Sequence, residues 1–169
     1  MADLATTVRE VDAFGLLADW EVDNVAAGVV SLAGEAMTSG PSDRPFGLGS
    51  LTKPLTALAV LVAVEEGTVG LDEPVGPPGA TVRHLLAHAG GLAPVHRRLI
   101  TAPGTRRIYS NAGFELLAEV VGIRADMEFS RYFHEAVCEP LGLGHTELDG
   151  SPAHGAKSSV SDLLRVAHE

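Results

Sequence analysis

Residues 46–67 read FGLGSLTKPLTALAVLVAVEEG, and the fold can be worked out from this stretch. It places the hydroxyl of Ser50 three residues before the amine of Lys53, just ahead of a long apolar run. Residues three apart share one face of a helix, so a helix that begins near Ser50 brings the two groups within hydrogen-bond reach. The run ends at Gly67, a residue type that commonly follows a helix. An ammonium group is costly to bury, so Lys53 is either solvated or used.

The chemistry of this turn is that of an activated nucleophile. A serine hydroxyl is a weak nucleophile at neutral pH and needs a base nearby. A lysine amine can serve when burial or a neighbouring cation favours its neutral form. The free N–H groups at a helix start favour negative charge that develops on an oxygen. Pro54 is harmless in a first turn and would distort a helix that began well before Ser50.

A second motif, RRIYSNAGFELL at residues 106–117, supports the first. Tyr109 carries a phenol that can pass protons if a nearby ammonium stabilises its phenolate. Asn111 carries an amide that can both donate and accept hydrogen bonds, so it could orient Lys53 and bind a substrate amide. The alternative is that Asn111 caps the helix that follows and Tyr109 packs in the core.

These motifs resemble those of a known enzyme superfamily. SLTK at 50–53, HLLAHAGGL at 84–92 and YSN at 109–111 are similar in order and spacing to the serine β-lactamases and penicillin-binding proteins. The resemblance is narrower to the branch of class C β-lactamases, DD-peptidases and esterases, in which Tyr-x-Asn replaces Ser-x-Asn. It covers nearly the whole chain from about residue 26.

The resemblance implies a role for each site residue. Ser50 would be the acylated nucleophile, and its backbone N–H would be half of an oxyanion hole. Lys53 would help to take the serine proton, and Tyr109 would shuttle a proton to the leaving group. Asn111 would bind the substrate amide. The substrate would be a small or peptide-like acyl compound, as for a β-lactamase, a D-Ala-D-Ala carboxypeptidase or an esterase, and no cofactor is implied.

The expected fold is α+β and β-lactamase-like, with the later strands of the antiparallel sheet missing. Residues 1–46 would hold an N-terminal helix and a strand pair, and residues 47–169 a helical region with both motifs. Two strands alone make a poor sheet, so we expect a C-terminally truncated, partial domain. The patterns predict a strand hairpin over 26–40 and helices over 4–18, 50–66, 81–91, 111–122, 126–143 and 159–169. Pro140 and Gly142 are expected to stop the helix over 126–143, and a serine is expected to cap the last one.

The superfamily's third motif, Lys or His followed by a small residue and Gly, is not found. HAG at 88–90 lies too early, HTE at 145–147 lacks the glycine, and HGA at 154–156 falls at the approach to a helix. The missing strand would supply the second oxyanion donor, whose loss costs about 3 kcal/mol of transition-state stabilisation. We therefore expect weak or no activity from this chain alone, and self-association or binding of a complementing C-terminal segment. The second hypothesis is a non-catalytic remnant or binding module of the same fold.

Composition bounds the remaining possibilities. The 169 residues suit one domain, and the net charge of -10 argues against nucleic acid or an anionic membrane as partner. The longest apolar run is too short to span a bilayer, and the first residues lack the pattern of a secretory signal, which predicts a cytoplasmic protein. Cys138 is interpreted as a small buried hydrophobe.

His84 and His88 are four residues apart, a spacing that can hold a metal ion on a helix. No third ligand is obvious beside them, and the glutamate that a zinc protease would place after the first histidine is missing. We therefore favour structural roles for both residues and predict no metal site.

Overall fold

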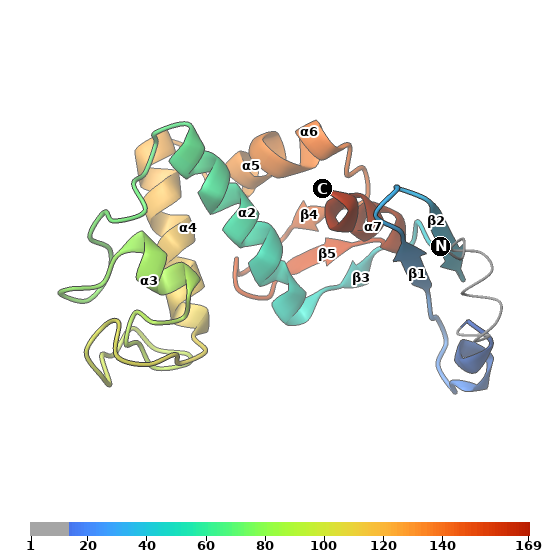
Figure 1. The fold of residues 1–169 in the computed structure, drawn as a ribbon, viewed down its shortest axis with the longest axis horizontal. Coiled ribbons are helices and arrows are strands. Elements are labelled where there is room, and N and C mark those ends of the chain that lie inside the picture. Colours follow the sequence, from blue (N-terminus) through green and yellow to red (C-terminus); the bar gives the residue numbers. More distant parts are fainter. Residues whose placement is uncertain (1–13) are drawn as a thin grey trace.

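A computed structural model describes residues 14–169. The molecule is elongated, with a helical region at one end and a strand hairpin under the last helix at the other (Figure 1). A short sheet joins the two ends. Most of the helix predicted over 4–18 lies outside the described residues, and within them a 3-10 helix, η1, covers Gly15–Asp19.

The helices follow one another along most of the chain. They are η2 (Gly49–Leu51), α2 (Thr52–Glu65), α3 (Val82–Leu86), α4 (Asn111–Ala125), α5 (Phe129–Phe133), the π-helix η3 (His134–Cys138), α6 (Glu139–Leu141) and α7 (Val160–His168). The strands are β1 (Ala27–Val30), β2 (Ala36–Ser39), β3 (Phe46–Gly47), β4 (Glu147–Leu148) and β5 (Ala156–Ser158).

The strands form two small antiparallel sheets. β1 and β2 make the predicted hairpin, with Val29 opposite Met37. The second sheet has the order β3-β5-β4. Our expectation of no strands beyond the first pair was wrong, because strands of two or three residues are too short to show alternation in the sequence.

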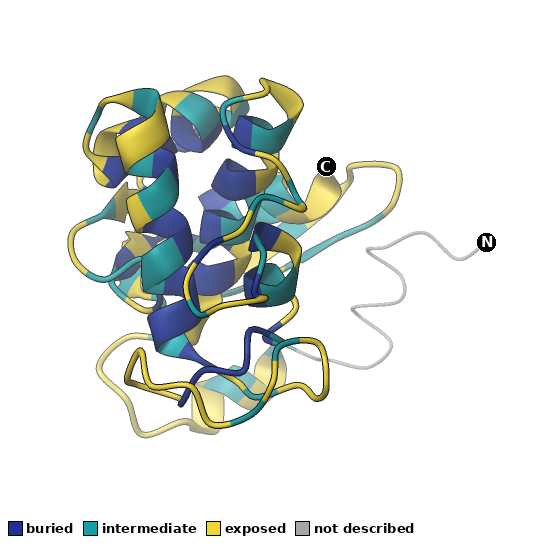
Figure 2. Cartoon of the chain, turned by 90° about the vertical axis from the view of Figure 1, so that its left-hand side faces the viewer, coloured by how far each residue is buried: buried dark blue, intermediate teal, exposed yellow. Residues whose placement is uncertain are grey.

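The main core lies between α2, α4 and the helices that follow α4. Leu117 and Phe133 are fully buried there, and complete burial of such a side chain contributes about 1.5–3 kcal/mol. Figure 2 shows buried residues gathered on the inner faces of the helices and exposed residues outside them. This packing fixes α2, and with it the start of α2 that carries both residues of the first motif.

The helix predicted over 126–143 is a continuous helical stretch with a π-turn inside it. Pro140 has no N–H to donate, and its ring would clash with the carbonyl four residues earlier in a regular helix. The π-helix η3 immediately before it is the kind of local adjustment that relieves such a clash. Pro140 therefore does not stop the helix, which ends instead where Gly142 adopts a left-handed conformation (φ 63°).

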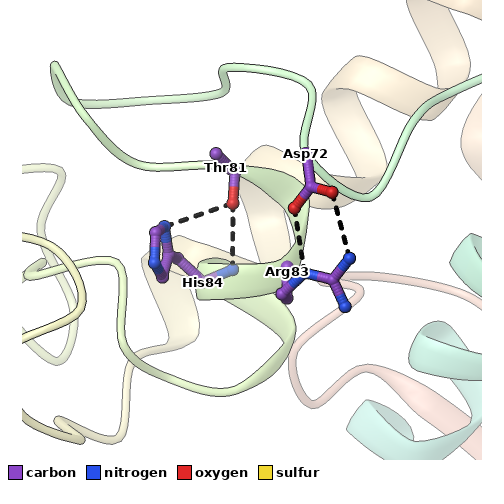
Figure 3. Close-up of polar contacts among 4 residues, drawn as sticks. All are labelled: Asp72, Thr81, Arg83 and His84. Carbon is purple, nitrogen blue, oxygen red and sulfur yellow. Dashed lines mark hydrogen bonds and ion pairs between the residues drawn. The ribbon is translucent and has the colours of Figure 1, made fainter.

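The start of α3 is tied to the loop before it (Figure 3). The Thr81 hydroxyl accepts a hydrogen bond from the His84 N–H and lies 3.1 Å from Nδ1 of the same residue. Arg83 donates two hydrogen bonds to the Asp72 carboxylate, at 2.9 and 3.1 Å. α3 is shorter than predicted, since it ends at Leu86.

Two threonines on α2 hold residues 152–156 against the helix. The Thr52 hydroxyl accepts from the Ala156 N–H at 3.0 Å, and the Thr56 hydroxyl donates to the Pro152 carbonyl at 2.7 Å. Both threonine side chains are buried. These bonds join the β3-β5-β4 sheet, and the turn before β5, to the start of α2, which carries Lys53.

Candidate functional site

Ser50 and Lys53 meet as their spacing predicts. Ser50 lies in η2, directly before α2, and is exposed, whereas Lys53 is in the first turn of α2 and is only 3% exposed. The Lys53 Nζ lies 3.2 Å from the Ser50 Oγ. Because α2 begins after Ser50, Pro54 falls in its first turn and distorts nothing. The arrangement pairs an accessible hydroxyl with a buried amine.

The buried Lys53 has no carboxylate within 4.0 Å among residues 14–169. Its Nζ donates instead to the Ala153 carbonyl, at 2.8 Å. The ring centroids of Tyr109 and Phe114 lie 4.6 and 5.9 Å from the same nitrogen. Aromatic faces attract a cation, so these rings and the carbonyl compensate the charge without neutralising it.

Tyr109 lies beside this pair rather than in the core. Its side chain is 48% exposed, which excludes the alternative of a core residue. The adjacent Lys53 ammonium, followed by the Ser50 hydroxyl, holds the pKa of the Tyr109 phenol below its usual value. A phenol with a lowered pKa is better suited to pass a proton near neutral pH.

Asn111 is placed differently from the other three predicted residues. The cap of α4 is Ser110, whose hydroxyl accepts from the Gly113 N–H at 3.2 Å, so the alternative of Asn111 as cap is wrong. The Asn111 Oδ1 is buried and has no hydrogen-bond partner among the described residues. The Lys53 Nζ bonds to Ser50 and Ala153, and no hydrogen bond joins it to Asn111 among residues 14–169. An unpaired buried acceptor costs about 1–3 kcal/mol, which a ligand donor would recover.

His88 is a site residue whose role the sequence analysis missed. Its Nδ1 accepts from the Ser110 N–H at 3.1 Å, and its carbonyl accepts from the Ile108 N–H at 2.7 Å. Its ring packs 4.5 Å from that of Tyr109 and 5.0 Å from that of Phe114, centroid to centroid. His88 thereby fixes residues 108–110, the segment that presents Tyr109.

The state of His88 fits this role. Burial, followed by the charges of Arg107 and Lys53, lowers its pKa, so the ring is neutral at pH 7 and Nδ1 is free to accept. Its backbone is left-handed (φ 58°), which is uncommon for histidine and is held by the surrounding bonds. No local signal reveals this contact, because Ser110 is 22 residues away in the chain.

The structure does not place the two histidines of HLLAH on one helical face. His84 lies on α3, but that helix ends at Leu86 and His88 follows in a left-handed conformation. The Nδ1 of each histidine already has a protein partner. Within residues 14–169, no group of three or more His, Cys, Asp or Glu residues is arranged to hold a metal ion.

A cavity of about 360 Å³ opens over the paired hydroxyl and amine. It is lined by Ser50, Lys53, Pro54, Ala57, Leu86, His88, Arg107, Tyr109 and Phe114. A larger cavity of about 520 Å³ lies against α4 and α5, but its titratable lining residues are Glu115, Glu119 and Glu128. The smaller cavity contains the Ser50–Lys53 pair in hydrogen-bond contact, and we take it as the candidate active site.

Two further observations bear on other functions. Cys138 is buried, and burial, followed by the charge of Asp162, raises the pKa of its thiol to about 11, which makes it a poor nucleophile. No helix in the described part of the chain is long and apolar enough to cross a membrane.

Comparison with known proteins gives a consistent set of matches. A family profile described as Beta-lactamase matches residues 20–167. The solved β-lactamase Mb2281c from Mycobacterium bovis is 53% identical, with a TM-score of 0.89 over 92% of this chain and 58% of that one. A β-lactamase/D-alanine carboxypeptidase structure from Pseudomonas syringae shares the fold at 20% identity, with a TM-score of 0.81 over 96% of this chain and 64% of that one.

One curated relative is the D-alanyl-D-alanine-carboxypeptidase/endopeptidase AmpH of Escherichia coli K12. It is 28% identical over 157 residues, which cover 71% of this chain. The match covers 41% of AmpH, so the chain spans less than half the length of this relative.

Proposed function

The chain belongs to the β-lactamase family, and from this premise we propose that it is a serine hydrolase that forms an acyl-enzyme on an amide or ester. The observation that carries the proposal is the 3.2 Å approach of the Lys53 Nζ to the exposed Ser50 hydroxyl. The cavity above them is large enough for a small acyl group.

In the acylation step, the Ser50 Oγ attacks the substrate carbonyl carbon and its proton passes to the pair formed by Lys53 and Tyr109. The negative charge that forms on the carbonyl oxygen faces the Ser50 N–H, which lies in a first helical turn where N–H groups lack intrahelical partners. The bond to the leaving group then breaks. The leaving group receives a proton through Tyr109, and Lys53 restores the phenol.

Deacylation reverses these roles. Water attacks the ester carbonyl of the acyl-enzyme, and Tyr109 with Lys53 takes its proton. The acid product leaves, and the Ser50 hydroxyl is regenerated. Asn111 does not line the cavity and its Oδ1 is buried, so the contact with the substrate amide that the resemblance implies requires its side chain to turn toward Ser50.

The substrate class follows from the family, and we propose an ester, a β-lactam or a D-alanyl-D-alanine peptide. AmpH is by its name a carboxypeptidase and endopeptidase for D-alanyl-D-alanine. Slow turnover is expected, because the Ser50 N–H is the one oxyanion donor that we assign within residues 14–169.

Covalent labelling tests the proposal. The chain is treated with a fluorophosphonate and with a fluorescent penicillin, and the modified residue is mapped by peptide mass spectrometry. A single adduct on Ser50 is expected, and it should be lost in Ser50→Ala. Ser130→Ala is the matched control, because Ser130 is also exposed but lies on α5, where it lines the larger cavity and not the candidate active site, and it should label like the wild type.

Two outcomes contradict the proposal. Persistent labelling of Ser50→Ala would move the nucleophile to another residue. Reversible binding of the penicillin with no adduct would favour a non-catalytic binding module of the same fold.

A further inference from the structure

The wall of the candidate site that carries Tyr109 has an unusual charge. Residues 74–114 contain five of the chain's 12 basic residues and none of its 22 acidic residues. The rest of the chain is therefore strongly acidic. Arg83 and Arg97 are paired with acids outside the segment, which leaves Arg98, Arg106 and Arg107 without a carboxylate within 4.0 Å among the described residues. Clefts lined by one sign of charge concentrate ligands of the opposite sign, so these three cations would attract anions.

Within this segment, Arg107 is the cation that reaches the cavity. Residues 107–110 belong to no helix or strand, and two of the four face the candidate site. Arg107 and Tyr109 line the cavity, whereas Ile108 and Ser110 do not and bond to His88 through their N–H groups.

The Arg107 guanidinium has no carboxylate within 4.0 Å in residues 14–169. Arg44, Arg98, Arg106 and Arg165 likewise have no carboxylate partner in this part of the chain, but Arg107 is the one arginine among the residues that line the cavity. A guanidinium presents parallel N–H donors that match a carboxylate or phosphate. Its charge also reaches the catalytic groups, because it helps to lower the pKa of both Tyr109 and His88.

We propose that Arg107 determines specificity by binding a carboxylate, or another anionic group of like geometry, on the leaving-group side of the acyl substrate. The leaving-group side follows from Tyr109, which lines the same cavity as Arg107 and is proposed to protonate the leaving group. The inference rests on the proposed acyl-enzyme reaction. It assigns to Arg107 a preference for anionic leaving groups, which the Ser-x-x-Lys and Tyr-x-Asn motifs do not specify.

A matched pair of substrates tests the preference. Phenyl acetate with a meta carboxylate on the ring is compared with its meta carboxamide, so that only the charge of the leaving group differs. The acylation rate of Ser50 is measured under single-turnover conditions by phenol release and by intact mass. The wild type should react roughly tenfold to a hundredfold faster with the carboxylate ester. This factor corresponds to the contribution of a hydrogen bond to a charged group.

Variants at neighbouring arginines assign the effect. Arg107→Gln should bring the rate ratio of the two esters close to one, and Arg107→Lys should restore part of it, since the charge remains but the paired donors are lost. Arg106→Gln is the control, because Arg106 carries the same charge one residue away but does not line the cavity, and it should keep most of the wild-type ratio.

The outcomes separate the two proposals. Acylation of Ser50 at equal rates by both esters, or an unchanged ratio in Arg107→Gln, overturns the role of Arg107 and leaves the hydrolase intact. The absence of any adduct on Ser50 with either ester overturns the hydrolase, and the role of Arg107 with it.

Discussion

The chain has two tyrosines, and their surroundings act on them in opposite directions. Tyr109 faces the Lys53 ammonium, which favours its phenolate and lowers its pKa. Tyr132 is buried and donates to the Glu66 carboxylate at 2.7 Å, and both burial and that carboxylate raise its pKa. The difference makes the candidate catalytic phenol distinguishable in solution.

A titration of absorbance at 295 nm should therefore show two separate steps, one below pH 10 and one above it. The first step should vanish in Tyr109→Phe and move to higher pH in Lys53→Met, because the cation that stabilises the phenolate is gone. A single step near pH 10 that survives in Tyr109→Phe would show that Lys53 and Tyr109 do not interact.

The raised pKa of the Tyr132 phenol makes the stability of the fold depend on pH. Its folded pKa lies above the unfolded value of about 10, so the stability it provides is present below pH 10 and is lost as pH rises through the folded pKa. Urea denaturation should show a smaller loss of unfolding free energy above pH 10 in Tyr132→Phe than in the wild type. An equal loss in both would place the alkaline instability elsewhere.

His88 offers a test of positioning. Because its folded pKa lies below 6.5, the unfolded chain binds the extra proton more readily, and stability should fall as pH falls from 6.5 through the folded pKa. His88→Ala should lose about 2–4 kcal/mol of stability by leaving a cavity and an unpaired Ser110 N–H. His88→Ala should also slow the labelling of Ser50 and reduce the loss of stability below pH 6.5. If His88 only stabilised the fold, the variant would lose stability, but its folded fraction would label at the wild-type rate.

At the scale of elements, helices were predictable where their signals are local. The pairing of Ser50 with Lys53 follows from helical spacing, and the Ser159 cap of α7 follows from residue type. Side-chain chemistry suggested proton transfer for Tyr109 and amide binding for Asn111, and the resemblance implied the same roles. Of these two residues, only Tyr109 lines the cavity.

Non-local contacts could not be read from the sequence. The acceptor of Lys53 is a backbone carbonyl, that of Ala153, which any residue type could provide. Thr52 and Thr56 were ordinary residues of an apolar helix until their partners at 152–156 were known. The two-residue strands likewise depend on pairing between distant segments rather than on their own composition.

The cap of α7 gives a prediction at this scale. Ser159 is fully buried and its hydroxyl accepts from the Asp162 N–H, so Ser159→Ala should lower the free energy of unfolding by about 1–2 kcal/mol. Ser161→Ala is the control, since its hydroxyl bonds only to the exposed Asp43 and should change stability by less than about 0.5 kcal/mol. Urea denaturation followed by circular dichroism measures both, and equal effects would contradict the capping role.

At the scale of the whole molecule, the β1–β2 hairpin is joined to the rest through α7. Gly28 allows this close contact, because a Cβ there would lie 2.7 Å from the Val160 Cγ1 and 2.8 Å from the Leu164 Cδ1. β2 is the only strand that pairs with β1 within residues 14–169, so the other edge of β1 presents unpaired backbone groups. Such edges pair readily with another chain.

We therefore expect self-association that increases with concentration. Light scattering coupled to size-exclusion chromatography should show masses above 17.6 kDa at high protein concentration. Val29→Lys places a charge on the edge strand and should shift the population toward the monomer. A constant monomeric mass across concentrations would contradict the expectation.

The bond from Lys53 to the Ala153 carbonyl joins positions 100 residues apart, and Thr52 and Thr56 reach equally far along the chain. During translation, Ser50 and Lys53 therefore leave the ribosome long before residues 152–156, which hold the start of α2, have been synthesised. Nascent chains arrested before residue 152 lack the carbonyl that holds Lys53, so Ser50 should not be acylated in them. Ser50 should become reactive only after this region has been synthesised.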